Sequence, residues 1–311
     1  MILENTYIYK LCGHRIMLIT ILCLLGLCYN HPSMAQKVTE KKGSKVYIDH
    51  ADNLRHNQML MPDVQIAKGN VRLRYKGMTL SCDSAYFNEQ SNWFKAFGKV
   101  HVTRPGGVTL DCRRLHYDGM SQMVHVREKV VVRQPGKSLR CDSLDYNMTS
   151  KVANYFGGRG TLVYNGNTVI ADQGDYNTES HDANFFGNVV MFTPKYRITT
   201  PEAHGNTETG LVHVVGKSVI RTAKGEVVHT SDGTYNSRTD NMELNGHSTI
   251  TSPKQDVEGD NIVYNSSTGE AEGHGNVKIV DKANDRTIIG QDVFYNEKTG
   301  HSNARGNVKI D

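Results

Sequence analysis

Apolar and polar residues alternate along most of the chain with a period of two. Val71 and Leu73 alternate with Arg72 and Arg74. The same alternation recurs at Val100 and Val102, Val130 and Val132, Val189 and Met191, Val277 and Ile279, and Val308 and Ile310. A period of two gives a β-strand one apolar side and one polar side. No stretch after residue 35 has the 3.6-residue period of an amphipathic helix, so the pattern predicts an all-β protein.

The alternating segments belong to a repeat of 29 to 31 residues. One mark of the repeat is a Gly-Asn-Val or Gly-Lys-Val step, which begins at residues 69, 98, 187, 275 and 306. The other mark is an aromatic residue followed by Asn or Asp, at 87, 117, 146, 176, 235, 264 and 295. One aromatic is missing, and Gly205-Asn206 stands in its place. Self-similarity at this period indicates units that stack on one another.

Two features of each unit predict where the backbone changes direction. The Gly-Asn steps fit turns with positive φ that precede a strand. In the strand that leads to each aromatic mark, the apolar parity shifts at Cys82-Asp83, Cys112-Arg113, Cys141-Asp142 and Ala171-Asp172. A parity shift indicates a bulge or corner within the strand. We expect the Asp that follows to bind backbone amides in the bend.

A unit of about 30 residues is too small to bury its apolar side alone, whereas a stack of units does so. Each buried Val, Leu or Ile then contributes roughly 1.5–3 kcal/mol. We predict an elongated solenoid or rolled two-sheet structure over residues 64–311, open along one seam. Residues 36–63 are predicted to be flexible or irregular. The sequence stops at Asp311 after a Gly-Asn-Val strand, so either the native protein continues or this end is open for stacking.

The N-terminus predicts export. Lys10, His14 and Arg15 precede an apolar run over residues 16–28, and Pro32-Ser-Met-Ala35 follows. This order is typical of a secretory signal peptide, here residues 1–35 with cleavage after Ala35. The apolar run is shorter than the ~20 residues of a spanning helix; an uncleaved anchor is the alternative. The net charge of +4 is too small to indicate a nucleic-acid partner.

Repeated carboxylates raise the question of an active site. They lie at or one residue from the same position of each unit, at Asp83, Asp142, Asp172, Asp232, Asp260 and Asp292. A hydrolase needs two carboxylates in unlike environments at one place, whereas Asp repeated at turns has a structural explanation. The chain has no nucleophile elbow, P-loop or dinucleotide fingerprint, and its histidines lack the spacing of metal ligands. We predict no enzyme, metal or cofactor.

Cys82, Cys112 and Cys141 occupy equivalent places in three successive units. Stacked in register they would form a ladder, and adjacent strands at ~4.8 Å would allow a disulfide. Ala171 takes the same place in the next unit, which favours the alternative that these are small buried residues.

The apolar interior is the remaining candidate site. A seam between two apolar sheets can admit acyl chains, and each CH₂ buried there contributes ~0.8 kcal/mol. The candidate lining is Val71, Leu73, Val100, Val102, Val130, Val132, Val189, Met191, Val277 and Ile279. A plain packed core is the alternative. Basic residues that could meet phosphates near one end are Arg72, Arg74, Lys76, Arg104, Arg113 and Arg114, although each also fits a solvated surface charge.

The Ala/Cys-Asp-x-x-x-Tyr-Asn strand and the Gly-Asn-Val strand starts, behind an export signal, resemble the OstA-like family over residues 46–311. The best matches are Cys82–Asn88, Cys141–Asn147, Ala171–Asn177 and Gly259–Asn265. This family contains the periplasmic bridge protein of lipopolysaccharide transport, its inner-membrane-anchored partner and the periplasmic domain of the outer-membrane translocon. The resemblance implies a V-shaped β-jellyroll that carries lipid A acyl chains in an apolar groove.

The resemblance also implies a periplasmic location and end-to-end joining, either with itself or with inner- and outer-membrane components of the same fold. The chain is longer than a single bridge domain, so it holds either one extended jellyroll or two consecutive ones. It lacks the C-terminal barrel of the translocon. Two other functions stay open: a structural or adhesive β-solenoid with a filled core, and a solenoid carbohydrate-active enzyme.

Overall fold

The computed structural model describes residues 47–56, 63–75, 77–88, 90–265, 267–282, 285–296 and 298–310. The predicted signal peptide lies outside these residues. All regular structure in them is β, which confirms the predicted class. The strands are β1 (Tyr47–His50), β2 (Asn53–His56), β3 (Val64–Tyr75), β4 (Met78–Asn88), β5 (Trp93–Arg104), β6 (Val108–Asp118), β7 (Met123–Gln134), β8 (Lys137–Asn147), β9 (Val152–Phe156), β10 (Gly160–Tyr164), β11 (Asn167–Ala171), β12 (Gln173–Asn177), β13 (Asp182–Phe192), β14 (Tyr196–Asn206), β15 (Leu211–Thr222), β16 (Val227–Asn236), β17 (Asn241–Thr251), β18 (Gln255–Asn265), β19 (Glu270–Asp281), β20 (Arg286–Asn296), β21 (Ser302–Arg305) and β22 (Lys309–Ile310).

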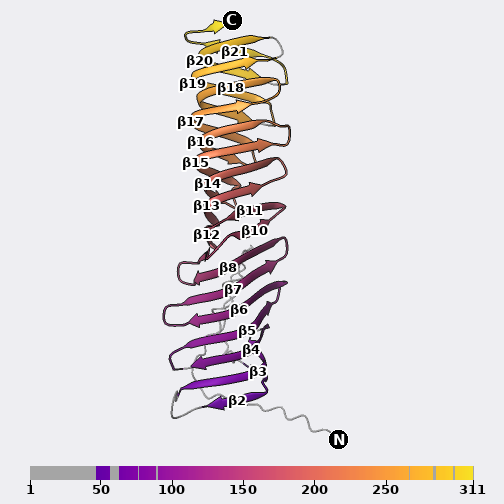
Figure 1. Ribbon diagram of the computed structural model, residues 1–311, viewed down its shortest axis with the longest axis vertical. Coiled ribbons are helices and arrows are strands. Elements are labelled where there is room, and N and C mark those ends of the chain that lie inside the picture. The colour runs from indigo at the N-terminus through magenta and orange to yellow at the C-terminus, as the bar shows by residue number, and fades with distance from the viewer. Residues whose placement is uncertain are drawn as a thin grey trace, which may run out of the picture.

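The strands form one antiparallel sheet in which each layer pairs with the next in sequence. Most layers are single strands of 10 to 12 residues, and four are split into two short strands: β1/β2, β9/β10, β11/β12 and β21/β22. The result is a tall stack whose long axis crosses the strands (Figure 1). At ~4.8 Å between strands, the stack is about 80 Å long. The sheet is continuous through the two split layers near its middle.

Each long strand bends at a bulge in its centre. Gly69 and Asn70 have φ values of 78° and 48°, and the pairing of β3 with β4 skips both residues. The same interruption occurs at Gly98-Lys99 in β5 and Gly187-Asn188 in β13. Positive φ at these steps is therefore confirmed, but the prediction that they are turns before a strand is wrong. They lie inside strands because a bulge of two left-handed residues interrupts the hydrogen-bonded pairing locally, and the pairing with the next strand resumes after it.

The parity shifts are the other side of the same bulges. The pairing of β4 with β5 skips Cys82 and Asp83, which confirms the predicted corner. The carboxylate after the corner contacts the facing bulge of the next strand. Asp172 accepts a hydrogen bond from the Asn188 side-chain amide at 2.7 Å, and equivalent bonds join Asp52 to Asn70 and Asp260 to Asn276. For Asp172 and Asp260, where we expected backbone amides as partners, the partner shown by these bonds is a side-chain amide.

The aromatic–Asn marks end strands. The side-chain oxygen Oδ1 of Asn147 accepts hydrogen bonds from the backbone amides of Thr149 and Ser150 at 2.9 and 3.0 Å, which closes the turn after β8. The same pair of bonds recurs after Asn177, Asn206, Asn236, Asn265 and Asn296. Tyr117 and Tyr146, the aromatic residues of two such marks, are fully buried in the interior.

The sheet begins earlier than the sequence indicates. Residues 47–50 and 53–56 fall in the segment predicted to be flexible or irregular, but they form β1 and β2 and pair with β3. Their short length hides the period-two pattern from the sequence. Among the residues that the structure describes, no helix is long and apolar enough to cross a membrane.

Val277 tests the inward assignment near the C-terminal end. Its side chain is 1% exposed. We expect Val277→Asp to unfold the terminal strands and lower the melting temperature, because an unpaired buried charge is costly. The control is Lys278→Asp, at the exposed neighbouring position. An unchanged melting curve and unchanged proteolysis of β19–β22 in Val277→Asp would contradict the assignment.

Gly98 tests the bulge. A Cβ there would lie 2.2 Å from Oδ2 of Asp83, whereas a Cβ at Gly106, which also has positive φ, would meet nothing within 4 Å. Gly106→Ala should cost about 1–2 kcal/mol, from the left-handed backbone alone. Gly98→Ala should cost roughly 1–3 kcal/mol more, from overpacking. Denaturant unfolding measures both losses of stability. Equal losses would show that the contact between Asp83 and Gly98 imposes no steric demand.

Candidate functional site: the apolar interior and its seam

The bend in each strand brings the two strand ends toward each other across the interior. The turns therefore form two rows along the stack. We call the row after the aromatic–Asn marks the aromatic turn row; it includes the turns between β14 and β15 and between β16 and β17. The opposite turn row includes the turns between β10 and β11 and between β13 and β14. The line between the two rows is the seam.

Side chains bridge the seam near the middle of the stack. The Tyr164 hydroxyl, from β10, lies 3.5 Å from the carbonyl oxygen of Thr207 in the aromatic turn row. Lys195 Nζ, from the opposite row, lies 2.6 Å from Oδ1 of Asp240. Just inside that pair, the Tyr196 and Tyr235 rings meet edge to face with centroids 5.0 Å apart. The bend divides the sheet into two facing halves, which we call the two sheets. They therefore touch here through side chains.

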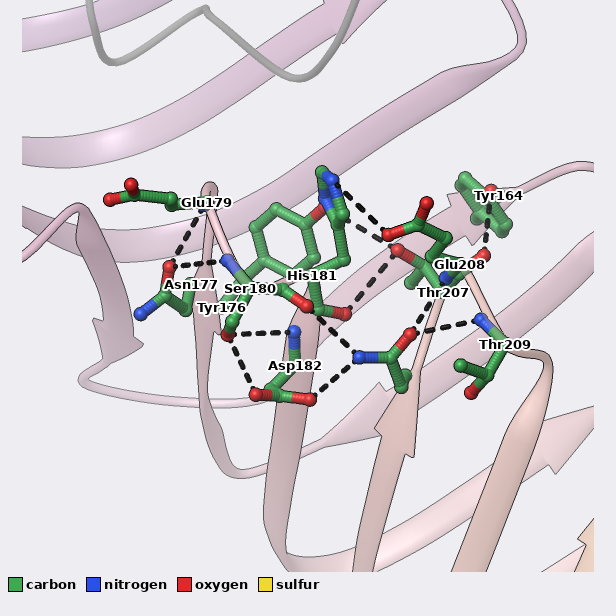
Figure 2. Close-up of polar contacts among 11 residues, drawn as sticks. Tyr164, Tyr176, Asn177, Glu179, Ser180, His181, Asp182, Thr207, Glu208 and Thr209 are labelled. Atoms are coloured by element: carbon green, nitrogen blue, oxygen red, sulfur yellow. Dashed lines mark hydrogen bonds and ion pairs between the residues drawn. The ribbon is translucent and has the colours of Figure 1, made fainter.

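Figure 2 shows the aromatic turn row at the first of these bridges. The Tyr176 hydroxyl lies 3.1 Å from Nδ1 of His181 and 3.4 Å from Oγ1 of Thr207. Asp182 accepts a hydrogen bond from the Asn206 amide at 2.7 Å. These contacts tie two neighbouring turns of the aromatic turn row together, and Tyr164 reaches them from the opposite row.

The ten predicted lining residues all face the interior, and they differ in how deeply they are buried. Eight are buried: Val71, Leu73, Val100, Val102, Val130, Val189, Met191 and Val277 are at most 8% exposed. Val132 and Ile279 are partly buried. Val277 and Ile279 apart, they belong with the other core residues to one continuous apolar cluster that extends from β3 to β18. Most of this interior is packed.

An apolar cavity lies between the two sheets in the C-terminal half. It is small, with a volume of about 10 Å³ and so room for about one water molecule. It is lined by Tyr196, Ile198, Val212, Val214, Ile220, Gly233, Thr234, Tyr235, Met242 and Leu244. Val212 pairs in register with Gly205, the position where the repeat lacks its aromatic. The missing ring and Gly233 leave this part of the interior less filled.

Buried hydroxyls in the interior corner are a feature that the sequence analysis missed. Ser218 Oγ lies 2.9 Å from Oγ1 of Thr200, and Ser248 Oγ lies 2.9 Å from Oγ1 of Thr230. All four side chains are at most 5% exposed, and each also contacts a bulge carbonyl. The signal was present, because Ser replaces the Val of the repeat at 218 and 248. The corner thus carries Cys82, Cys112 and Cys141 in the N-terminal half, where Ser143 is also buried, and paired hydroxyls from β14 to β17.

The basic candidates do not converge on the interior. Arg72 and Arg74 alternate with Val71 and Leu73 and so lie on the outer face. Arg74 pairs with Asp49 at 3.0 Å, and Arg114 pairs with Glu128 at 2.6 Å. Arg113 lies 4.0 Å from the same glutamate. Arg104 shares the parity of Val100 and Val102 at the seam end of β5. Lys76 lies outside the described residues.

The repeated carboxylates contact side chains of the adjacent strand. Asp232 is 2.9 Å from Nε2 of His213, and Asp292 is 2.9 Å from Nδ1 of His274. The bond from His213 holds the pKa of Asp232 below its usual value. In the described part of the chain, no group of three or more potential ligands could hold a metal ion. The predictions of no enzyme and no cofactor stay predictions.

The three cysteines are free and buried. Each repeat unit contributes two strands, so Cys112 pairs with Val100 rather than with Cys82. The interpretation as small buried residues is confirmed, and the disulfide alternative is wrong. Burial raises the pKa of the Cys82 thiol to about 11 and those of Cys112 and Cys141 to about 12.

Comparison with known proteins places the chain in a family. The family model described as OstA-like protein matches residues 43–201. The chain belongs to the OstA-like family. The model described as LptA/(LptD N-terminal domain) LPS transport protein matches residues 168–301 of this OstA-like protein. No curated protein matches it. Among solved structures, it is similar to LptH from Pseudomonas aeruginosa, the LptA-homologous periplasmic component of a lipopolysaccharide transport device, with 15% identity over 47% of this chain and 93% of that one and a TM-score of 0.24.

Thiol reactivity tests the packing of the corner. We expect Cys82, Cys112 and Cys141 in the mature protein to resist a maleimide at pH 8, because each is buried and its pKa lies well above that pH. All three should react at once in denaturant. Rapid labelling of the folded protein, measured by mass spectrometry, would mean that the N-terminal half opens far more readily than its packing indicates.

Proposed function

We propose that this OstA-like protein is a periplasmic bridge that carries lipopolysaccharide from the inner to the outer membrane, with the lipid's acyl chains between its two apolar sheets. The single observation that supports this is the apolar interior that continues from β3 to β18, within a stack of about 80 Å. An interior that repeats layer by layer offers an acyl chain similar surroundings at each step. Movement along it therefore needs no large rise in free energy.

The route would run behind the seam. The two sheets are joined covalently at the bulged corner but only by side chains at the seam, so separation there breaks no backbone ladder. Burial of acyl CH₂ groups at ~0.8 kcal/mol each would offset the loss of side-chain packing. At the cavity beside Gly205 and Val212, less packing would be lost than in the filled parts of the interior.

End-to-end association fits the ends of the stack. β1 and β2 pair on one side with β3, and β21 and β22 pair on one side with β20. Exposed apolar side chains lie at both ends: Tyr47 and Leu54 at the first, Val308 and Ile310 at the last. Strand addition would give these backbone groups partners and cover the apolar side chains. The partner would be a second copy or a membrane component of the same fold.

A structural β-solenoid is the second candidate function. The observation that favours it is the packing of the interior, where Val102, Val124 and Val189 are fully buried. Such a solenoid would keep lipid out of the interior.

Photo-crosslinking separates the two. A small diazirine-bearing aliphatic residue at Val100, Val130 or Val189 should capture lipopolysaccharide in cells, because the acyl chains would contact these inward positions. Matched controls are Lys99 and Lys129, the exposed neighbours of Val100 and Val130. Lipid adducts at the lysine positions alone would contradict the bridge, and no adducts at any position would favour the structural solenoid.

A further inference from the structure

One ion pair joins the two rims of the seam. Lys195 lies in the turn between β13 and β14, and Asp240 lies in the turn between β16 and β17, 45 residues later. Their side chains meet at 2.6 Å. The turns belong to opposite rows, so this pair closes the gap between the two sheets directly outside the cavity.

The two partners are held differently. Asp240 also accepts hydrogen bonds from the Tyr235 hydroxyl at 3.1 Å and from Ser267 Oγ at 2.8 Å, both on its own rim. The bonds from Lys195 and Ser267 hold the pKa of Asp240 below its usual value, so the carboxylate is ionised at neutral pH. Lys195 is 54% exposed and extends on a flexible stem. Lys195 is therefore the member that can move away.

The ion pair adjoins two of the residues that line the cavity. Tyr196 follows Lys195 in sequence, and the Tyr235 hydroxyl donates a hydrogen bond to Asp240. The two rings meet edge to face, and both line the cavity. Moving Lys195 away would thus release one ring from the other at the mouth of the apolar space.

We propose that Lys195 and Asp240 form a latch on the seam, and that an acyl chain enters sideways between Tyr196 and Tyr235 when the latch opens. The latch rests on the proposed function, because it assumes that lipid enters the interior. A phosphate on the lipid would draw Lys195 from Asp240, since an ammonium group binds phosphate as a point charge. Acylated and phosphorylated amphiphiles are therefore the ligand class that opens it.

Charge exchange tests the latch. The probe is lipid A with a fluorescent acyl chain, presented to the mature protein in detergent micelles, and the measurement is the rate of fluorescence increase as the chain enters an apolar site. Lys195→Glu should raise that rate about two- to fivefold, the range that loss of an exposed ion pair allows. Lys195→Glu with Asp240→Lys should return the rate to that of the unchanged protein.

Lys254→Glu is the matched control. Lys254 lies in the same row as Lys195 and is exposed, and no ion pair of the described residues includes it. Its charge change should leave the rate unchanged, and melting curves check that every variant is folded. Two results would overturn the latch, provided that equilibrium binding of lipid A is normal. One is an equal rate for Lys195→Glu and the unchanged protein, and the other is a double variant as fast as the single one. If no variant takes up lipid A, the transport proposal fails and the latch fails with it.

Discussion

The fold depends on a left-handed bulge in the middle of every second long strand, which faces the corner of the strand paired with it. Two residues of the bulge are left-handed in β3, β5, β7, β13 and β19, and one glycine is in β15 and β17. Glycine leads most of these bulges, because positive φ costs it nothing and because the facing carboxylate leaves no room for a Cβ at Gly98 or Gly69. Without the bulge the strands would be straight, and the stack would be a flat sheet with one face of Val, Leu and Cys in water. The bend places both halves of that face against each other.

The same bend separates two kinds of connection between the half-sheets. At the corner they are joined by continuous backbone and by clasps such as Asp172 with Asn188. At the seam they are joined by single side chains, Tyr164 on one bridge and Lys195 on the other. Breaking a hydrogen-bonded ladder would require unfolding of the sheet, whereas exposed side-chain pairs contribute little free energy. Any opening of this molecule is therefore directed to the seam.

The repeat is regular in its backbone but not in its interior. The corner carries Cys82, Cys112 and Cys141 in the N-terminal half, and Thr200 and Thr230 further along. The row of inward aromatics is interrupted once, at Gly205, and the cavity lies beside that gap. A stack of equal units would have equal packing throughout. These departures leave a small cavity between the two sheets, beside the place where the latch joins them.

The sequence by itself determined the class of the fold, the unit length, the inward residues and the existence of a corner in each strand. These follow from period-two alternation and from positive-φ steps, which are local properties of the backbone. It did not reveal that Gly69-Asn70 lies within a strand, since a bulge and a turn demand the same φ. Only the tertiary structure decided that Lys195 meets Asp240, because the bend and twist of the whole sheet select which turns face each other across the seam.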